Sequence, residues 1–425
     1  MLRSRLDGQH FDVIVCGAGS AGTAAAYGAA RTGARTLLIE RLGFAGGTPV
    51  AGMIHTLDAV NSCVNPSQPV VAGFAAELQK ELRQMDGLGT ADNPEEVVSF
   101  HPEYMKVALD RLLVLAGVTT FYRATAIDAL VQVDRVTAVE VSLVDGRAHF
   151  TANCVVDATG DAEIANFAGA AWKQSEELQA ITYHFRLGNV AANQTWRELE
   201  NACQLAMEDS QIAYGGPWVI RLNQHEVSIN STRLAGNPTD PEERTNLERN
   251  AREAMLTIFS ILKSGVPALR DSYILTGATD LHVRESRKLE GVYTLTEEDI
   301  WQRRKFEDTI ALGAWPIDIH PTNGFVGVHP HKDNPPAPYE IPYGCLVPRS
   351  VDGLLVAGRP ISTTHRAHGS TRVPGTSLAT GHAAGVAAAL SALKGVAPRR
   401  ANVSEIRSQL LRQGAILSLD AAVAR

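Results

Sequence analysis

A glycine-rich turn between an apolar run and an alanine-rich stretch is the feature that most limits how this chain can fold. The turn covers residues 17–22 and follows an apolar run at 11–16, which predicts a buried strand. The alanine-rich stretch 21–32 predicts a helix, and a second apolar run, 36–39, ends at Glu40. A strand, tight turn, helix and second strand within about thirty residues are typical of a βαβ unit.

Each residue of the turn has a position that suits a dinucleotide. Gly17 permits the tight turn, Gly19 lets the backbone approach a pyrophosphate, and Gly22 lets the helix pack closely on the strand. Ser20 and Ala21 begin the helix, whose free N–H groups and positive dipole attract a diphosphate. We therefore predict a dinucleotide site at this turn.

Glu40, at the end of the second strand, narrows the choice of dinucleotide. Its carboxylate can accept hydrogen bonds from ribose hydroxyls and would repel a 2′-phosphate, which argues against NADP at this site. The βαβ unit alone does not distinguish NAD from FAD.

Four later stretches point to FAD. Residues 41–48, 155–161, 354–359 and 374–385 resemble, in order, successive motifs of the glutathione-reductase-type FAD fold. Together with Gly17, Gly19, Ser20, Ala21, Gly22 and Glu40, the residues expected to hold FAD are Arg41, Gly46, Gly47, Thr48, Ala126, Ala158, Thr159, Gly160, Gly358, Arg359, Gly375, Thr376 and Ser377.

The chain also resembles a broad bacterial family, the FAD-dependent oxidoreductases. The segments that carry this resemblance are 282–291, 295–300, 315–320, 341–343 and 361–370. The resemblance implies an α/β fold with a glutathione-reductase-type Rossmann FAD domain and an inserted α+β substrate domain. It implies FAD strongly and the substrate hardly at all, because one fold hosts many chemistries.

The order of the motifs predicts that both ends of the chain build the FAD domain. We expect its first part at residues 1–167, including a three-stranded meander at 124–157, and its second part at 343–425. The substrate domain then occupies residues 168–342. Other expected strands are 181–187, 226–230 and 353–357, expected helices are 69–85, 102–116, 240–263, 373–393 and 402–413, and an expected loop is 321–338.

Composition excludes several partners. The net charge of −7 disfavours a nucleic-acid surface, and the five scattered cysteines form no CxxC pair, so we expect no metal site and no disulfide framework. Residues 373–393 carry no charge but are rich in small side chains, which predicts an interior helix and no membrane partner. These features favour a cytoplasmic location. The oligomeric state stays open, a homo-oligomer included.

Candidates for the chemistry are His320, His365, His368, Arg284 and Tyr343. Histidine suits proton transfer near neutral pH, and His365 and His368 lie between the late strand and the terminal helix, where the chain should pass the flavin. Arg284 could bind a substrate carboxylate or phosphate, and Tyr343 could orient a hydroxyl. The alternative for the three histidines and for Tyr343 is a structural hydrogen bond. For Arg284 the alternatives are support of a flavin-facing loop and local ion pairs with Glu285 and Glu290.

These residues lead to three functional hypotheses. The first is an FAD-dependent dehydrogenase or oxidase that passes hydride from an alcohol, sugar or amine to flavin N5. The alternatives are an NAD(P)H-driven flavin reductase or monooxygenase, and a non-catalytic flavin-binding protein. The substrate is expected to be a small molecule, and the electron acceptor is open among oxygen, a quinone, a nicotinamide and a protein.

Overall fold

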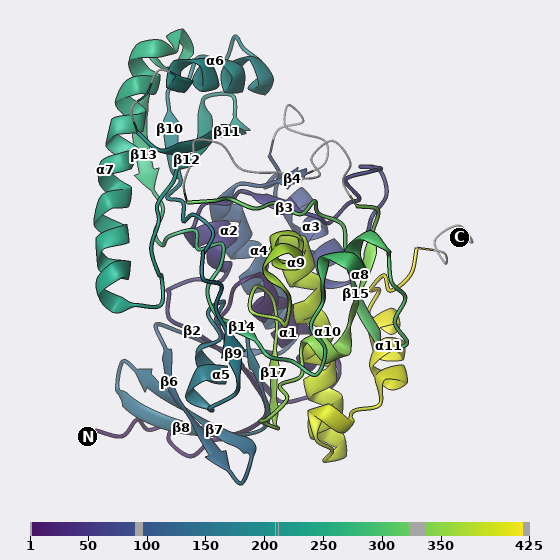
Figure 1. The fold of residues 1–425 in the computed structure, drawn as a ribbon. Helices are drawn as coiled ribbons and strands as arrows, with labels where there is room; N and C mark the ends of the chain where they lie inside the picture. Colours follow the sequence, from purple (N-terminus) through teal and green to yellow (C-terminus); the bar gives the residue numbers. More distant parts are fainter. Residues whose placement is uncertain (1, 90–96, 209, 211, 323–335, 420–425) are drawn as a thin grey trace.

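A mixed sheet of seven strands lies in the lower part of the molecule in the view of Figure 1. The computed structural model describes residues 2–89, 97–208, 210, 212–322 and 336–419. The strands in spatial order are β5 (Thr119–Tyr122), β2 (Thr36–Glu40), β1 (His10–Cys16), β8 (Gly146–Asp157), β7 (Arg135–Leu143) and β6 (Thr125–Gln132), with β17 (Leu354–Val356) also paired to β8. Pairing is parallel from β5 to β8 and β17, whereas β6, β7 and β8 form the predicted antiparallel meander.

The long strand β8 joins the meander to the parallel strands. Its first half pairs with β7, and its last residues pair with β1 and with β17, which comes from the far end of the chain. Asp157 therefore lies beside Cys16 and Val356. The carboxyl ends of the parallel strands share one edge of the sheet, where ligands bind in open α/β sheets.

Helix α10 (Pro374–Lys394) packs closely against α1 (Ser20–Arg31) over one face of this sheet. A Cβ atom on Gly385 would lie 1.9 Å from the carbonyl oxygen of Ala25, so only glycine fits at this contact. The remainder of α10 is alanine-rich and largely buried, which confirms the predicted interior helix.

Among the helices of the described residues, none has both the length and the apolar character that a bilayer crossing requires.

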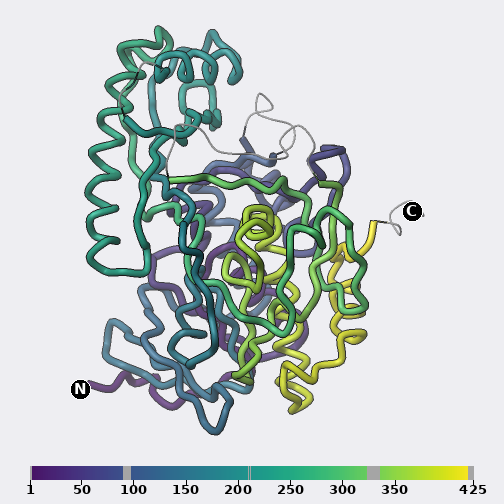
Figure 2. Tube along the Cα trace, in the orientation of Figure 1, coloured from purple at the N-terminus to yellow at the C-terminus, as the bar shows by residue number. Residues whose placement is uncertain are grey.

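A second, antiparallel sheet of four strands stands apart from the first, near the top of Figures 1 and 2. Its strands, in order, are β11 (Tyr214–Asn223), β12 (Glu226–Thr232), β10 (Phe185–Gly188) and β13 (Tyr273–Gly277). Helices α6 (Trp196–Glu208) and α7 (Pro241–Gly265) cover it and enclose an apolar core with Phe185, Ile229 and Leu262.

Further helices and strands connect and flank the two sheets. They are α2 (Gly47–Ala51), β3 (Thr56–Asp58), α3 (Phe74–Gln84), β4 (Val97–Ser99), α4 (Pro102–Leu115), α5 (Glu163–Phe167), β9 (Trp172–Lys173), β14 (Lys288–Leu289), α8 (Glu297–Trp301), β15 (Thr309–Gly313), β16 (Tyr339–Pro342), α9 (His365–Thr371) and α11 (Val403–Arg412).

The α/β class and the parallel nucleotide-binding sheet are confirmed, and two element boundaries are corrected. The helix expected at 69–85 begins only at Phe74, because the Val70 and Val71 amides donate to the carbonyl of Val60. The strand expected at 181–187 begins at Phe185, since Ile181 makes only an isolated bridge. Most of the expected loop, residues 323–335, lies outside the described residues.

Candidate functional site

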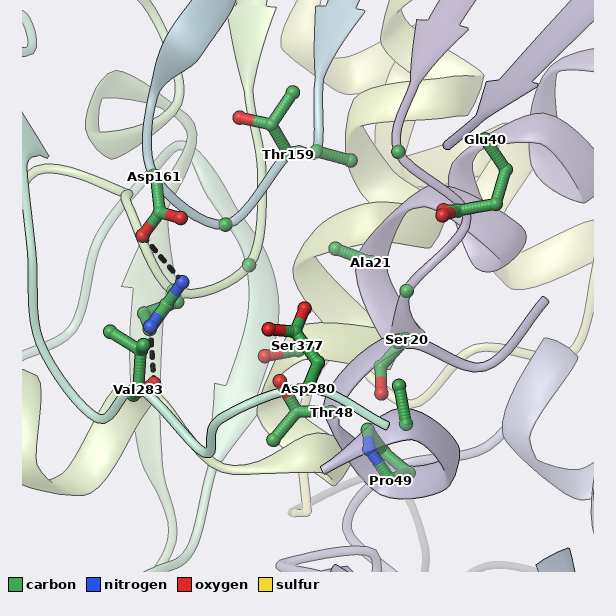
Figure 3. A pocket seen from close by; sticks show the side chains of 18 of the residues that line it. Ser20, Ala21, Glu40, Thr48, Pro49, Thr159, Asp161, Asp280, Val283 and Ser377 are labelled. Atoms are coloured by element: carbon green, nitrogen blue, oxygen red, sulfur yellow. Dashed lines mark hydrogen bonds and ion pairs between the residues drawn. The ribbon is translucent and has the colours of Figure 1, made fainter. Parts of the chain in front are cut away.

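A large cleft opens at the carboxyl ends of β1, β2, β8 and β17 and encloses about 1370 Å³ of empty space, part of it open to solvent. Figure 3 shows its walls. The predicted cofactor residues that line it are Gly17, Gly19, Ser20, Ala21, Glu40, Arg41, Gly47, Thr48, Ala126, Ala158, Thr159, Gly160, Gly358, Arg359 and Ser377. Gly22, Gly46, Gly375 and Thr376 are not among the lining residues.

The glycine turn forms one wall of the cleft. Gly17 has φ of +92°, and a Cβ atom there would lie 2.5 Å from the carbonyl oxygen of Ala158. A Cβ on Gly22 would lie 1.7 Å from the carbonyl oxygen of Gly17, so the helix can pack this closely on the turn only with glycine at position 22. Because α1 begins at Ser20, its free N–H groups face the cleft, as a diphosphate requires.

The carboxylate of Glu40 is bound on both of its oxygens. Oε2 accepts the N–H of Ala18 at 2.7 Å, and Oε1 accepts the N–H of Leu42 at 2.7 Å. Burial raises the pKa of Glu40, and these two backbone donors oppose that effect. The carboxylate thus holds the turn in place. It also lines the cleft, where its remaining lone pairs can accept hydrogen bonds from ribose hydroxyls.

The later motifs bring backbone close to the turn. A Cβ on Gly47 would lie 2.5 Å from the Cα of Gly19, and one on Gly358 would lie 2.7 Å from the Cβ of Ala21. Ser377, in the first turns of α10, lines the same space. Segments that are far apart in the sequence therefore lie close together around the cleft. We call these closely packed glycine segments the cradle, and they leave space for an extended ligand.

Asp161 and Arg359 form an ion pair across the cleft wall, with 2.7 Å between the Asp161 Oδ1 and Arg359 Nη2 atoms (Figure 3). Arg359 also donates to the carbonyl of Val283. Burial raises the pKa of Asp161, but Arg359 and the Ser286 hydroxyl outweigh that effect and lower it overall. The pair ties β17 and the loop after β8 to the segment around Val283.

Asp280 lines the cleft although it belongs to no recognisable sequence motif. It accepts from Arg41, which follows β2, and from Nη2 of Arg244 in α7 at 2.5 Å. All three side chains line the cleft. Asp280 therefore links the strand β2 side of the first sheet to helix α7, which covers the second sheet.

Arginines and a histidine line the cleft toward the start of α10. Arg284 donates through Nη1 to the carbonyl of Ala180 at 2.7 Å and to the hydroxyl of Thr182 at 2.5 Å. Arg372 and His282 line the same region. Of the predicted catalytic residues, Arg284 is the one that reaches the cleft.

His320 and Tyr343 are buried and are not among the lining residues. The Nε2 atom of His320 lies 2.9 Å from Asp318, and burial, reinforced by the nearby Arg284 charge, lowers the pKa of His320 to about 3. The hydroxyl of Tyr343 donates to the carbonyl of Pro398 at 3.0 Å.

The two histidines of α9 are likewise held by hydrogen bonds outside the set of lining residues. The Nε2 atom of His368 lies 2.9 Å from the carbonyl oxygen of Arg284, and burial lowers the pKa of His368 to about 3. The Nδ1 atom of His365 lies 3.0 Å from Glu285, and neither histidine is a lining residue. Their predicted catalytic roles stay predictions.

The cleft suits FAD. It has a cradle in which a Cβ at three positions would collide with backbone, a helix N-terminus for the diphosphate, and a buried carboxylate at the end of the second strand. These features define a dinucleotide-binding α/β enzyme. The chain belongs to the FAD dependent oxidoreductase family, whose model matches residues 12–410. The family match confirms the predicted cofactor and the predicted enzyme class.

Solved structures share the fold at low sequence identity. A geranylgeranyl bacteriochlorophyll reductase-like protein from Thermoplasma acidophilum aligns with a TM-score of 0.53 and 13% identity, covering 96% of this chain and 84% of that one. A p-nitrophenol 4-monooxygenase from Pseudomonas putida aligns with a TM-score of 0.50 and 12% identity, covering 95% and 84%. A comparison with curated protein sequences gives no match.

Proposed function

We propose that this enzyme is an FAD-dependent reductase or monooxygenase whose flavin is reduced by NAD(P)H, and that its small-molecule substrate binds toward the start of α10. The observation that carries the proposal is which side chains line the cleft near the start of α10. Arg284, Arg372 and His282 line that part of the cleft, whereas His320, His365 and His368 do not.

Direct dehydrogenation of an alcohol or amine needs a base beside the substrate, with a pKa near the working pH. The pKa of His320 and that of His368 are both lowered to about 3, and burial lowers the pKa of His282 well below its usual value. Such rings are weak bases at neutral pH. This argues against the dehydrogenase hypothesis and favours electrons that enter from a separate donor.

The architecture is compatible with an external donor. The described residues contain one strand–glycine turn–helix unit of the dinucleotide type, so a nicotinamide would bind without a domain of its own. The two aligned structures are named as a reductase-like protein and a monooxygenase. We further propose the glutathione-reductase-type variant of the fold, with FAD parts at 1–167 and 343–425, a substrate domain at 168–342, and a cytoplasmic location.

A bound FAD would supply hydride and electron transfer between a nicotinamide and oxygen or a substrate. The protein supplies position and electrostatics. Glu40 holds the ribose end, the α1 N-terminus binds the diphosphate, and the positive end of the α10 dipole stabilises negative charge that develops nearby. Apolar residues, Ile54 and Pro374 among them, also line the cleft.

Anaerobic mixing tests the proposal. The FAD-loaded enzyme is mixed separately with NADH, with NADPH and with a panel of alcohols and amines, and flavin absorbance is followed against free FAD as the control. Bleaching by a nicotinamide, followed by oxygen uptake or substrate reduction after mixing with a second substrate, is expected. Bleaching by an alcohol or amine, with no response to either nicotinamide, would instead establish the dehydrogenase hypothesis.

A further inference from the structure

Two buried arginines line the cleft near the start of α10. Arg284 is 3% exposed, and the side chain of Arg372 is 7% exposed. Both line the cleft, and the Nε atom of each has no hydrogen-bond partner among the residues that the structure describes. Buried guanidinium groups with unused donors require an acceptor, because an unsatisfied buried charge is costly.

Among the charged groups that act most strongly on Arg284, two are arginines and one is a carboxylate. Burial and the neighbouring Arg372 guanidinium lower the pKa of Arg284 to about 9, and Arg233 acts in the same direction. Asp318 is the carboxylate that opposes them. That carboxylate is already shared, since it lies 2.9 Å from Nη2 of Arg372 and 2.9 Å from Nε2 of His320. Asp58 also lines the cleft. A further anion beside Arg284 would relieve the excess of positive charge.

The position of Arg284 is fixed before any ligand binds. Its Nη1 atom donates to the Ala180 carbonyl and to the Thr182 hydroxyl, so these contacts hold one side of the guanidinium fork. A fork held in this way loses little side-chain entropy on binding. The N-terminus of α1 would bind the diphosphate of FAD, which would leave these two arginines for another anion.

A neutral polar group completes the region. The Nδ1 atom of His282 is buried without a hydrogen-bond partner among the described residues, and the ring lines the cleft. Burial, followed by the Arg284 charge, lowers the pKa of His282, so the ring is neutral at physiological pH. It can exchange a hydrogen bond with a polar atom of a ligand held by the arginines.

We propose that Arg284 and Arg372 form a subsite for a carboxylate group of the substrate, with His282 as a neutral hydrogen-bonding neighbour. The identity of the ligand as substrate rests on the proposed function. The carboxylate class rests on the guanidinium excess and on Arg372, which already pairs with the planar carboxylate of Asp318 in this cluster.

The test uses acetate as the probe and acetamide as its uncharged counterpart of the same shape. Each is titrated into the FAD-loaded protein, and the visible absorbance of the flavin and the thermal midpoint are recorded. We expect saturable binding of acetate and none of acetamide. Arg284→Met and Arg372→Met should each weaken acetate binding by about tenfold or more, as the loss of a charged hydrogen bond predicts.

Arg366→Met is the matched control, because Arg366 is half exposed and pairs with Glu297 on the surface. This variant should bind acetate like the unmodified protein. If Arg284→Met does not fold, Arg284→Lys and Arg372→Met provide the same comparison, since lysine keeps the charge but loses the planar fork.

Several results would overturn the proposal: no saturable binding of acetate, undiminished binding in both arginine variants, or inorganic phosphate bound as tightly as acetate. Loss of FAD in folded Arg284→Met with FAD retained in Arg366→Met would assign the guanidinium to the cofactor, and would also overturn it. Acetate binding needs no turnover. A failure of NAD(P)H to reduce the flavin is therefore a separate result.

Discussion

The carboxylate of Glu40 accepts the backbone N–H of Ala18 at 2.7 Å, so the end of the second strand holds the glycine turn that follows the first. The two halves of the dinucleotide motif are thus one hydrogen-bonded unit. Glu40 supports the shape of the diphosphate site as well as the ribose end, and its replacement should affect both.

Glu40→Gln should weaken FAD binding by about tenfold to a hundredfold. Glutamine offers one acceptor oxygen in place of two, so either Ala18 or Leu42 loses its partner and faces an amide N–H. Equilibrium dialysis measures the FAD dissociation constant. Glu103→Gln, at an exposed position paired with Lys106, is the control and should bind FAD normally. Equal affinity in both variants would mean that Glu40 does not support the site.

Gly385→Ala should destabilise the protein by about 3 kcal/mol or more, because the added Cβ would lie 1.9 Å from the carbonyl oxygen of Ala25 and would push α10 from α1. Gly395→Ala, at the end of the same helix, adds a methyl group to open space at φ of +65° and should cost only about 1 kcal/mol. Thermal melting compares the two. A similar loss at both positions would contradict the close helix contact.

Asp280→Asn should speed the release of FAD by about twofold to tenfold, since it weakens the pairs with Arg41 and Arg244 that join the two parts of the cleft wall. Stopped-flow fluorescence on dilution gives the rate. Glu248→Gln removes another partner of Arg244 that does not line the cleft, and its release rate should stay unchanged. No difference between the variants would show that the Asp280 pairs do not restrain FAD.

Tyr343→Phe should reduce stability by about 1 kcal/mol, because the carbonyl of Pro398 loses its buried donor. The turnover number should not change, since the Tyr343 side chain is not among the cleft residues. Chemical unfolding and steady-state kinetics separate the two effects. A drop in turnover without a loss of stability would restore the catalytic role predicted for this residue.

The local parts of the site were predictable from sequence, and the long-range parts were not. The turn at Gly17 and the acidic end of β2 lie within one βαβ unit, where spacing alone places them together. Asp280, Arg244 and His282 reach the cleft only because the loop after β13 and helix α7 fold back toward the first sheet. No short sequence motif predicts that these three residues line the cleft.

For the histidine candidates, the sequence predicts the segment but not the direction of its side chains. His365 and His368 are candidates because their segment is expected to pass the flavin. The segment forms α9, in which His368 lies against the carbonyl of Arg284 and His365 against Glu285. Position along the chain predicts which segment comes near a cofactor, but the helix register decides which side chains face it.

Glu163 gives the protein a defined pH dependence. Burial, followed by repulsion from Asp161 and Asp157, raises the pKa of Glu163 from 4.5 to about 7. The unfolded chain releases this proton near pH 4.5 and the folded chain near pH 7, so the folded state binds more protons between these values. The stabilisation is therefore complete below pH 4.5 and is lost as the pH rises through about 7.

Glu163→Gln removes this proton equilibrium while it keeps the shape of the side chain. Relative to the unmodified protein, the variant should gain on the order of 1–2 kcal/mol of stability between about pH 5 and about pH 8, after allowance for solvent screening. Chemical unfolding of the FAD-free protein at both pH values measures the change. Glu298→Gln, on the surface helix α8, is the control. A stability difference that stays constant with pH would contradict the raised pKa of Glu163.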